Sequence, residues 1–211
     1  MQQVDAIMPN MDTVPATEPR TRRTGGRSAV VRRAVLQAAL DELMEYGVAG
    51  LSTARIADRA GVHRTTVHRR WPDLTALITE ALLSDTASAV PIPDTGSVRG
   101  DLEALLRAIA ALVDSPAGRI RTRTLIADAA RSPEIGELVS HVWVTRFALG
   151  REVIERGIAR GELRRDIPPA TILATFIGPL YVRLLITDER IDDAFIQDVI
   201  EAGLTGSQAA E

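Results

Sequence analysis

Apolar residues recur at helical spacing along most of this 211-residue chain. Near the N-terminus, Leu36, Ala39, Leu40 and Leu43 fall at positions i, i+3, i+4 and i+7 and therefore share one face of a helix. Similar stripes, many of them bounded by glycine or proline, continue to the end of the chain. The pattern predicts an all-α fold. Helices are predicted over residues 28–46, 53–60, 63–70, 73–89, 98–114, 117–130, 133–160, 169–186 and 192–204.

Two segments interrupt or blur this pattern. The stretch 91–100 contains two prolines and two glycines, so it is predicted to be a loop between domains. Residues 119–123 alternate arginine with isoleucine and threonine, as in a strand, but no partner strand follows and the segment is kept helical. The expected organisation is a disordered N-terminal segment with a basic arm (1–27), a first helical domain with a linking helix (28–90) and a second helical domain (91–211).

The stretch 51–72, LSTARIADRAGVHRTTVHRRWP, fits two short helices joined by a tight turn. Ser52 or Thr53 can cap the first helix, and Gly61 permits the left-handed backbone that ends it. The second helix has one apolar residue to bury, Val67. Its other side chains are polar, namely Arg64, Thr65, Thr66, His68, Arg69 and Arg70.

A helix with so little apolar surface gains almost no stability from packing inside a protein. The arrangement is typical of a DNA recognition helix, which places its N-terminal side chains against base edges while the preceding helix lies across the backbone. Arginine suits both contacts because its guanidinium group donates to guanine and to phosphate oxygens. The alternative is an ordinary helical hairpin with a solvated outer face. Trp71, just beyond the helix, is expected to pack into the core rather than onto a base.

The net charge of −3 conceals an asymmetry along the chain. Residues 20–72 hold eleven arginines and four acidic residues, a net +7, while the other fourteen arginines and 24 acidic residues give −10. Lysine is absent, which first indicates codon bias in a GC-rich genome. The asymmetry favours contact between the N-terminal part and a polyanion such as DNA. A basic arm, either a DNA contact or a solvated tail, contains Arg20, Arg22, Arg23 and Arg27.

Four segments between residues 31 and 77, in the order AALDELMEYG, LSTARIADRAGV, HRTTVHRRWP and DLTALI, carry a family resemblance. They resemble the N-terminal DNA-binding domain of the TetR (tetracycline-repressor) family of bacterial regulators. Three positions depart from the family pattern, because His63 replaces a capping serine, His68 a tyrosine and Leu74 a lysine. Those family residues commonly contact phosphate, so neighbouring arginines are expected to supply part of these contacts. Base contacts are assigned to Arg64, Thr65 and Thr66, and phosphate contacts to Ser52, His68, Arg69 and Arg70.

The resemblance also implies a repressor that a small-molecule effector releases from its operator, with the effector site in the C-terminal domain. The effector would bind among the helices predicted between residues 98 and 186. Candidate apolar walls are Trp143, Phe147, Phe176 and Tyr181, and candidate polar groups are Arg123, His141, Arg146, Thr175 and Arg183. The last two helices, about 169–204, are assigned to a homodimer interface. Such a dimer would bind a palindromic double-stranded operator, one recognition helix to each half-site.

No pattern in the sequence indicates catalysis, a metal site or a bound cofactor. Cysteine is absent, and the histidines are His63, His68 and His141, of which the first two point to different sides of one helix. No run of about 18 apolar residues and no signal peptide are found, so no membrane segment is expected and the protein is expected in the cytoplasm. We therefore predict a DNA-binding regulator. The alternative is a helical ligand-binding or scaffold protein that does not bind DNA.

Overall fold

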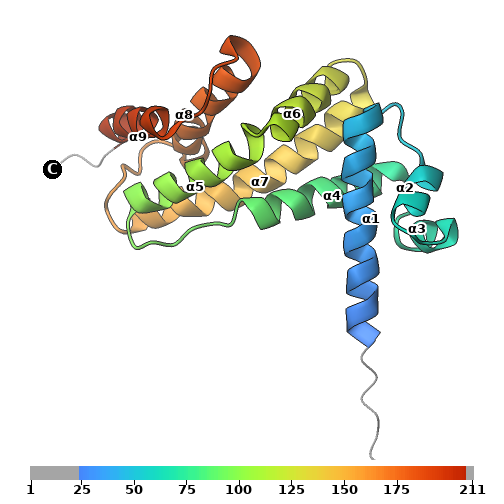
Figure 1. The fold of residues 1–211 in the computed structure, drawn as a ribbon. Helices are drawn as coiled ribbons and strands as arrows, with labels where there is room; N and C mark the ends of the chain where they lie inside the picture. Colours follow the sequence, from blue (N-terminus) through green and yellow to red (C-terminus); the bar gives the residue numbers. More distant parts are fainter. Residues whose placement is uncertain (1–23, 208–211) are drawn as a thin grey trace, which may run out of the picture.

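The computed structural model describes residues 24–207, with side chains from residue 26 onward (Figure 1). No strand occurs in this part of the chain, so the predicted all-α fold is confirmed, and residues 119–123 are helical as expected. The elements are α1 (Thr24–Tyr46), α2 (Thr53–Arg59), α3 (Arg64–Arg70), α4 (Leu74–Ala89), α5 (Val98–Val113), α6 (Pro116–Ala129), α7 (Pro133–Ala159), α8 (Pro169–Val182), the π-helical turn η1 (Arg183–Thr187) and α9 (Asp193–Ser207).

The start of α1 requires a correction to the predicted N-terminal segment 1–27. The helix begins at Thr24, so Arg27 belongs to a helix rather than to a flexible arm. The pattern placed the start later because each glycine in a helix costs roughly 1 kcal/mol relative to alanine, and two consecutive glycines occur here. The other arginines of the predicted arm, Arg20, Arg22 and Arg23, lie outside the described residues.

Local capping signals fix most of the helix ends. The hydroxyl oxygens of Ser97, Ser115 and Ser132 accept hydrogen bonds from backbone N–H groups in the first turns of α5, α6 and α7. Proline occupies the first turn of α6, α7 and α8, where its missing N–H is not needed. Glycines with positive φ lie just beyond the ends of α2 and α7, at Gly61 (65°) and Gly161 (78°).

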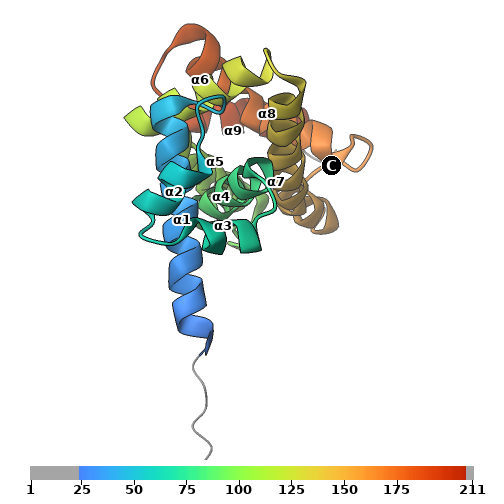
Figure 2. The ribbon, with the colours of Figure 1, turned by 90° about the vertical axis from the view of Figure 1, so that its right-hand side faces the viewer.

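Two hydrophobic clusters fill the molecule, and α7 contributes to both. The first cluster joins α1, α2, α3 and α4, and the second joins α5, α7, α8 and α9. Leu138, near the start of α7, packs in the first cluster, whereas Val153 and Ile154 pack in the second. Figure 1 shows α1, α2 and α3 at one end of the molecule and α8 and α9 at the other, and Figure 2 views the molecule from the α1–α3 end. Because α7 is one continuous helix of 27 residues, it connects the two ends.

The stretch Pro169–Thr187, formed by α8 and η1, is long and apolar enough to cross a bilayer by length and composition alone. The sequence-based expectation that no such run exists is therefore wrong, since Arg183 is its single charged residue. Core helices of proteins outside membranes meet the same criteria. Here six of the apolar side chains, five on α8 and Leu184 of η1, are buried in the second cluster, whereas Val182 and Ile186 are 50% and 78% exposed.

Candidate DNA-binding surface and effector pocket

A few small buried side chains hold the two short helices α2 and α3 together. Ile56 and Ala57 of α2 and Val67 of α3 are each no more than 1% exposed. Across the turn, the N–H of Val62 donates to the carbonyl of Ala57 at 3.0 Å. The turn passes through a glycine in the left-handed region, which a residue with a Cβ adopts only with strain. The predicted helix pair is confirmed, and Val67 is the only buried residue of α3.

The two arginines of α2 fix that helix to α1. The Glu42 side chain of α1 is 1% exposed and accepts from Arg55 Nε at 2.7 Å and from Arg59 Nη2 at 3.0 Å. Arg59 also contacts Glu45 at 2.5 Å, and the Arg55 guanidinium lies 4.2 Å from the centre of the Tyr46 ring. A buried carboxylate needs such partners, so these contacts hold α2 against α1. Helical periodicity contains no signal for this arrangement, because it treats every charged residue as exposed.

Trp71 closes α3 and joins it to α4. The ring is 3% exposed, and its indole N–H donates to Glu80 at 2.7 Å. Arg32 of α1 pairs with the same carboxyl group at 2.5 Å, so Glu80 connects α1, α4 and the end of α3. Asp73 caps α4 by accepting a hydrogen bond from the backbone N–H of Ala76 at 2.7 Å. The prediction that the Trp71 ring belongs to the core is confirmed.

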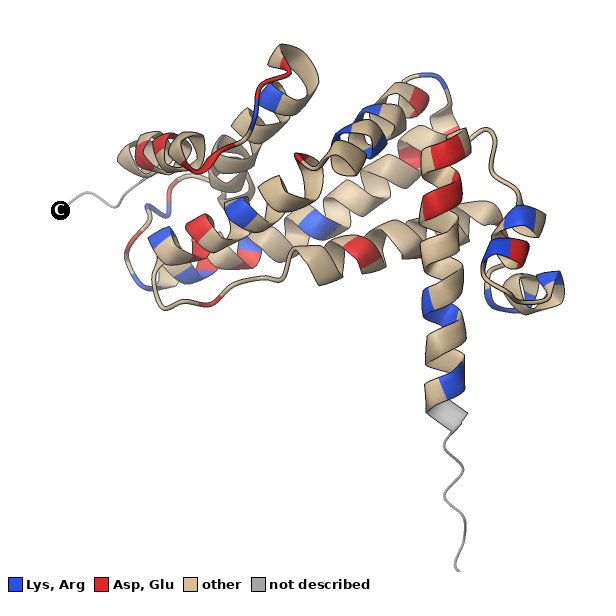
Figure 3. Ribbon diagram, viewed as in Figure 1, with Lys and Arg blue, Asp and Glu red and all other residues tan. Residues whose placement is uncertain are grey.

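The polar side chains of α3 form an outward face with few contacts to the rest of the protein. Of the six predicted DNA contacts on this helix, Thr66 is half-buried and the others are exposed. Arg64 Nε donates to His68 Nε2 at 3.3 Å, and the Arg70 guanidinium lies 5.5 Å from the Trp71 ring. None of the three arginines forms an ion pair with an acidic residue in the described part of the chain. Figure 3 shows basic residues on α2, α3 and the lower part of α1.

Ser52 and His63 occupy the N-cap positions of α2 and α3, but neither side chain accepts a capping hydrogen bond. The predicted capping role of the Ser52 side chain is therefore wrong, because its hydroxyl does not reach the first-turn N–H groups. Both helices begin with backbone N–H groups that lack a side-chain cap, and such groups suit a phosphate oxygen. The Ser52 hydroxyl likewise remains free for a contact outside the protein.

A cavity lies among α4, α5, α6, α7 and α8. Its volume is about 110 Å³, and a second chamber of about 70 Å³ shares part of its wall. The shared wall includes Trp143, Arg146 and Tyr181. Most other side chains around the larger chamber are aliphatic, including Leu82, Leu112, Val113, Leu125, Ile126, Val139 and Val142. A mostly apolar cavity with a few polar groups is typical of a small-molecule site.

The structure brings together only part of the predicted effector pocket. Of the predicted residues, those that line the chambers are Trp143, Arg146, Phe147 and Tyr181. The other five predicted residues line neither chamber, namely Arg123, His141, Thr175, Phe176 and Arg183. His141 and Thr175 are exposed outside the cavity, and Phe176 is fully buried against Gly203. The Arg183 guanidinium lies 3.5 Å from the centre of the Phe195 ring.

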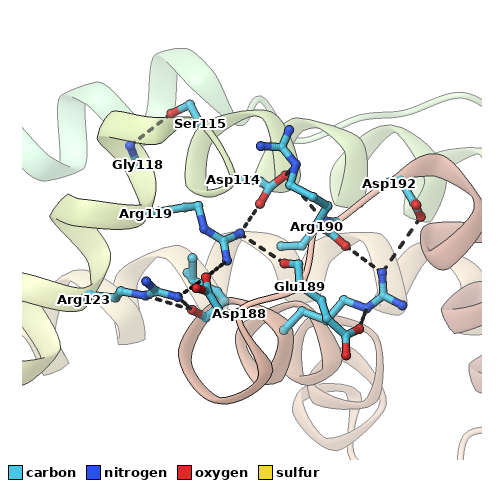
Figure 4. A network of polar contacts seen from close by, with 12 residues as sticks. Asp114, Ser115, Gly118, Arg119, Arg123, Asp188, Glu189, Arg190 and Asp192 are labelled. Carbon is cyan, nitrogen blue, oxygen red and sulfur yellow. Dashed lines mark hydrogen bonds and ion pairs between the residues drawn. The ribbon is translucent and has the colours of Figure 1, made fainter.

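Arg123 instead belongs to a polar network at the end of α8 (Figure 4). Its guanidinium donates to the carbonyl of Leu184 at 2.7 and 3.0 Å and to Asp188 at 2.6 Å. Arg119 contacts Asp188 at 2.5 Å and also pairs with Asp114. Asp188 has φ 57° and ends η1, and the hydrogen bond from Arg119 lowers the pKa of its carboxyl group. The network ties α6 to the end of α8.

Sequence reasoning missed the polar residues that α4 and α6 contribute to the cavity. Thr86 of α4 and Arg121 and Thr122 of α6 line the larger chamber, and Arg121 pairs with Asp85 at 2.8 Å. Arginine alternates with apolar residues in α6, so periodicity does not identify its inward face. Sequence reasoning also missed the hydrogen bond that the Asp128 carboxyl group accepts from the backbone N–H of Val48.

α6 also contacts the DNA-binding half of the molecule. The carboxyl group of Asp128 accepts a hydrogen bond at 3.2 Å from the backbone N–H of Val48, in the turn between α1 and α2. The helix that lines the cavity therefore reaches the segment that leads into α2.

The sequence matches known families over both halves. Residues 35–81 match the family described as "Bacterial regulatory proteins, tetR family", and residues 92–202 match "Tetracyclin repressor-like, C-terminal domain". The chain belongs to the TetR family. This TetR-family protein is 35% identical over 169 residues to the HTH-type transcriptional regulator AqdR of Rhodococcus erythropolis, across 79% of this chain and 81% of AqdR.

Two further similarities extend over most of this TetR-family chain. The HTH-type transcriptional regulator YdeS of Bacillus subtilis is 29% identical over 194 residues, 90% of this chain and 96% of YdeS. The crystal structure of the TetR-family transcription regulator SCO0332 has a TM-score of 0.71 and 32% identity, over 83% of this chain and 97% of that chain. The resemblance carried by the four N-terminal segments is thereby confirmed, and the protein is a TetR-family helix-turn-helix transcriptional regulator.

Proposed function

We propose that this regulator is a homodimeric, cytoplasmic repressor that binds a palindromic DNA operator and leaves it when a small-molecule effector binds. The observation that carries the proposal is the composition of α3, which buries Val67 alone and presents its polar side chains outward. In this proposal the first turn of α3 reads base edges and the flanking groups contact phosphates. The base-reading residues are Arg64, Thr65 and Thr66, and the phosphate contacts are Ser52, His68, Arg69 and Arg70.

A stripe of exposed small and apolar residues supports dimerisation through α8 and α9. Ala174, Gly178, Val182 and Ile186 are spaced four residues apart and are all exposed along α8 and η1. Small side chains allow a second helix to approach closely, and helices pack by fitting such ridges and grooves together. Pairing α8 and α9 of two protomers covers the stripe and relates the two α3 helices by twofold symmetry. Such a dimer meets two half-sites about 34–36 Å apart, one turn of DNA.

The cavity and the contact between α6 and the α1–α2 turn support regulation by an effector. A ligand that prefers a different spacing of the recognition helices lowers operator affinity, and a coupling of about 1–3 kcal/mol is sufficient for a 5- to 150-fold change. Two proteins that share this fold, at 19% and 16% identity, are described as the flavonoid-responsive regulator FrrA and as FadR of Bacillus subtilis in complex with stearoyl-CoA. In those proteins the fold accompanies small-molecule response or binding.

Operator binding tests the proposal directly. The purified protein is bound to labelled DNA from the intergenic region beside its own gene, with random DNA as competitor, across a series of salt concentrations. Arg64→Ala should cost about 1–3 kcal/mol on the operator and relax one base position. Arg70→Ala should weaken binding to operator and random DNA alike, and should reduce the slope of log affinity against log salt by about one.

The matched control is Arg165→Ala, which removes an exposed arginine from the loop between α7 and α8, far from α3. This variant should leave operator affinity unchanged. Equal losses on operator and random DNA for Arg64→Ala would refute the base-reading assignment. If a folded dimer shows no preference for the operator and no steep salt dependence, the rival function is favoured, namely a helical ligand-binding or scaffold protein.

A further inference from the structure

The cavity contains a cation, Arg146, that has no acidic partner among the described residues. Arg146 of α7 is half-buried, and its Nη2 donates to the backbone carbonyl of Val90 at 2.5 Å. Every other half-buried arginine among residues 26–207 pairs with a carboxylate, as Arg121 does with Asp85 on the same cavity wall. Desolvation lowers the pKa of Arg146, so its environment disfavours the charged form that it retains at neutral pH. A half-buried charge of this kind is stabilised when a ligand supplies the missing anion.

The rest of the lining favours an anion over a cation. Within the part of the chain that the structure describes, no aspartate or glutamate lines either chamber. Tyr181 and Trp143 lie edge to face, with ring centres 4.6 Å apart, in the same wall as the guanidinium. Burial raises the pKa of the Tyr181 phenol, which therefore stays protonated and presents an O–H donor, and an indole N–H is a donor only. Both groups can donate hydrogen bonds, and neither carries the negative charge that a cationic ligand would need.

The size and walls of the cavity restrict the body of the ligand. The two chambers of about 110 and 70 Å³ adjoin, because Trp143, Arg146 and Tyr181 line both of them. An apolar cavity of about 150 Å³ holds a benzene molecule in another protein, so the joined chambers suit one aromatic ring with a short substituent. Aromatic and aliphatic side chains on the other walls provide the apolar surface for such a ring.

We propose that the effector is a small aromatic carboxylate, whose carboxyl group pairs with Arg146 and whose ring lies against Trp143, Phe147 and the aliphatic wall. The inference rests on the proposed function for its regulatory meaning, but the binding preference itself is a property of the cavity. A bidentate contact between guanidinium and carboxylate gives the site its selectivity for charge. The Tyr181 hydroxyl donates a further hydrogen bond to the same group.

Three probes that share a phenyl ring test the proposal: phenylacetate, phenylacetamide and 2-phenylethylamine. Binding to the full chain without DNA is measured by calorimetry and by tryptophan fluorescence. The variant Trp143→Phe shows how much of the fluorescence comes from Trp71. Phenylacetate should bind at least tenfold more tightly than the amide, and the amine should bind weakest. Arg146→Gln should abolish the tenfold preference and change amide binding less than about twofold, whereas Arg146→Lys should retain part of the preference.

Arg151→Gln on the same helix is the matched control, because Arg151 is exposed, pairs with Glu155 at 2.9 Å and does not line the cavity. It should bind all three probes as the unmodified protein does, and circular dichroism should show that every variant is folded. The proposal is overturned if the amide or amine binds as tightly as phenylacetate, if Arg146→Gln keeps the preference, or if no probe binds at millimolar concentration.

Operator binding is measured in parallel, with and without the probe. Selective phenylacetate binding that leaves operator affinity unchanged would support the chemistry of the cavity but refute effector release. Loss of operator binding in the ligand-free protein would instead refute the DNA-binding part of the proposed function. The two failures are therefore distinguishable.

Discussion

Gly203 on α9 provides a sharp test of the packing between α9 and α8. A Cβ at this position would lie 2.8 Å from Cδ1 and Cζ of Phe176, and closer still to Cε1, whereas ordinary carbon contacts are about 3.5–4.0 Å. Phe176 is fully buried, so its ring cannot turn into solvent. In Gly203→Ala, the ring or the helix must move by about 1 Å, and overpacking of this kind costs about 1–3 kcal/mol.

Two effects oppose each other in Gly203→Ala. Alanine stabilises a helix by up to about 1 kcal/mol relative to glycine. The cost of overpacking at this site should lie near the upper end of the range given above, about 3 kcal/mol. The net expectation is a loss of about 2 kcal/mol, or a melting temperature about 4–8 °C lower. Because α9 is part of the proposed dimer interface, unfolding is measured in urea at one fixed protein concentration.

Gly206→Ala on the same helix is the matched comparison, because no heavy atom of residues 26–207 lies within 4 Å of its added Cβ. That variant should be unchanged or stabilised by about 0.5 kcal/mol. If Gly203→Ala proved as stable as Gly206→Ala, the close approach of α9 to Phe176 described above would be incorrect.

Asp128→Ala removes the acceptor for the Val48 N–H and should cost about 1 kcal/mol of stability, with faster hydrogen exchange at that amide. Unchanged exchange would show that the contact is not formed. Asp166 should titrate near pH 2 by NMR, because the hydrogen bond from Arg164 lowers its pKa to about 2. The small stabilisation from this exposed pair is present above the ordinary carboxyl pKa and is lost as pH falls from about 4 toward 2. Arg164→Gln should return the midpoint toward 4, and a midpoint already near 4 in the unmodified protein would contradict the pairing.

Helical periodicity and local end signals predicted most of the fold because these signals are contained within a few consecutive residues. The predicted start of α1 failed where two glycines weaken the pattern, although the helix continues through them. The apolar run of α8 and η1 was also missed, although Arg183 is the single charged residue within it. In both cases, the residues on either side continue the helix or the apolar run in spite of the glycines or the arginine.

The outward face of α3 was predicted from the sequence more fully than the lining of the cavity was. The outward face of α3 followed from sequence because the helix has one apolar residue and its polar groups must face outward. The cavity depends on which faces of α4, α6, α7 and α8 meet, and these contacts join residues far apart in the chain. His141 and Phe176 have side chains of a type that could line a ligand site, but they lie outside the cavity. The pairing of buried Glu42 with two arginines is also a long-range contact that periodicity does not encode.

The position of Glu42 has a consequence for genetic screens. Glu42→Gln would leave Arg55 without a carboxylate partner and Arg59 with Glu45 alone, which adds one net positive charge close to α3 and loosens the angle of α2. Attraction to any DNA would then rise while discrimination between sequences fell. A screen for loss of repression would therefore recover substitutions of Glu42 together with substitutions in α3. Glu42 nevertheless lies buried between α1 and α2, not on the outward face of α3. Competition with random DNA would separate the two kinds of mutant. Mutants at residue 42 would still bind DNA but would be held at nonspecific sites, whereas mutants in α3 would lose affinity.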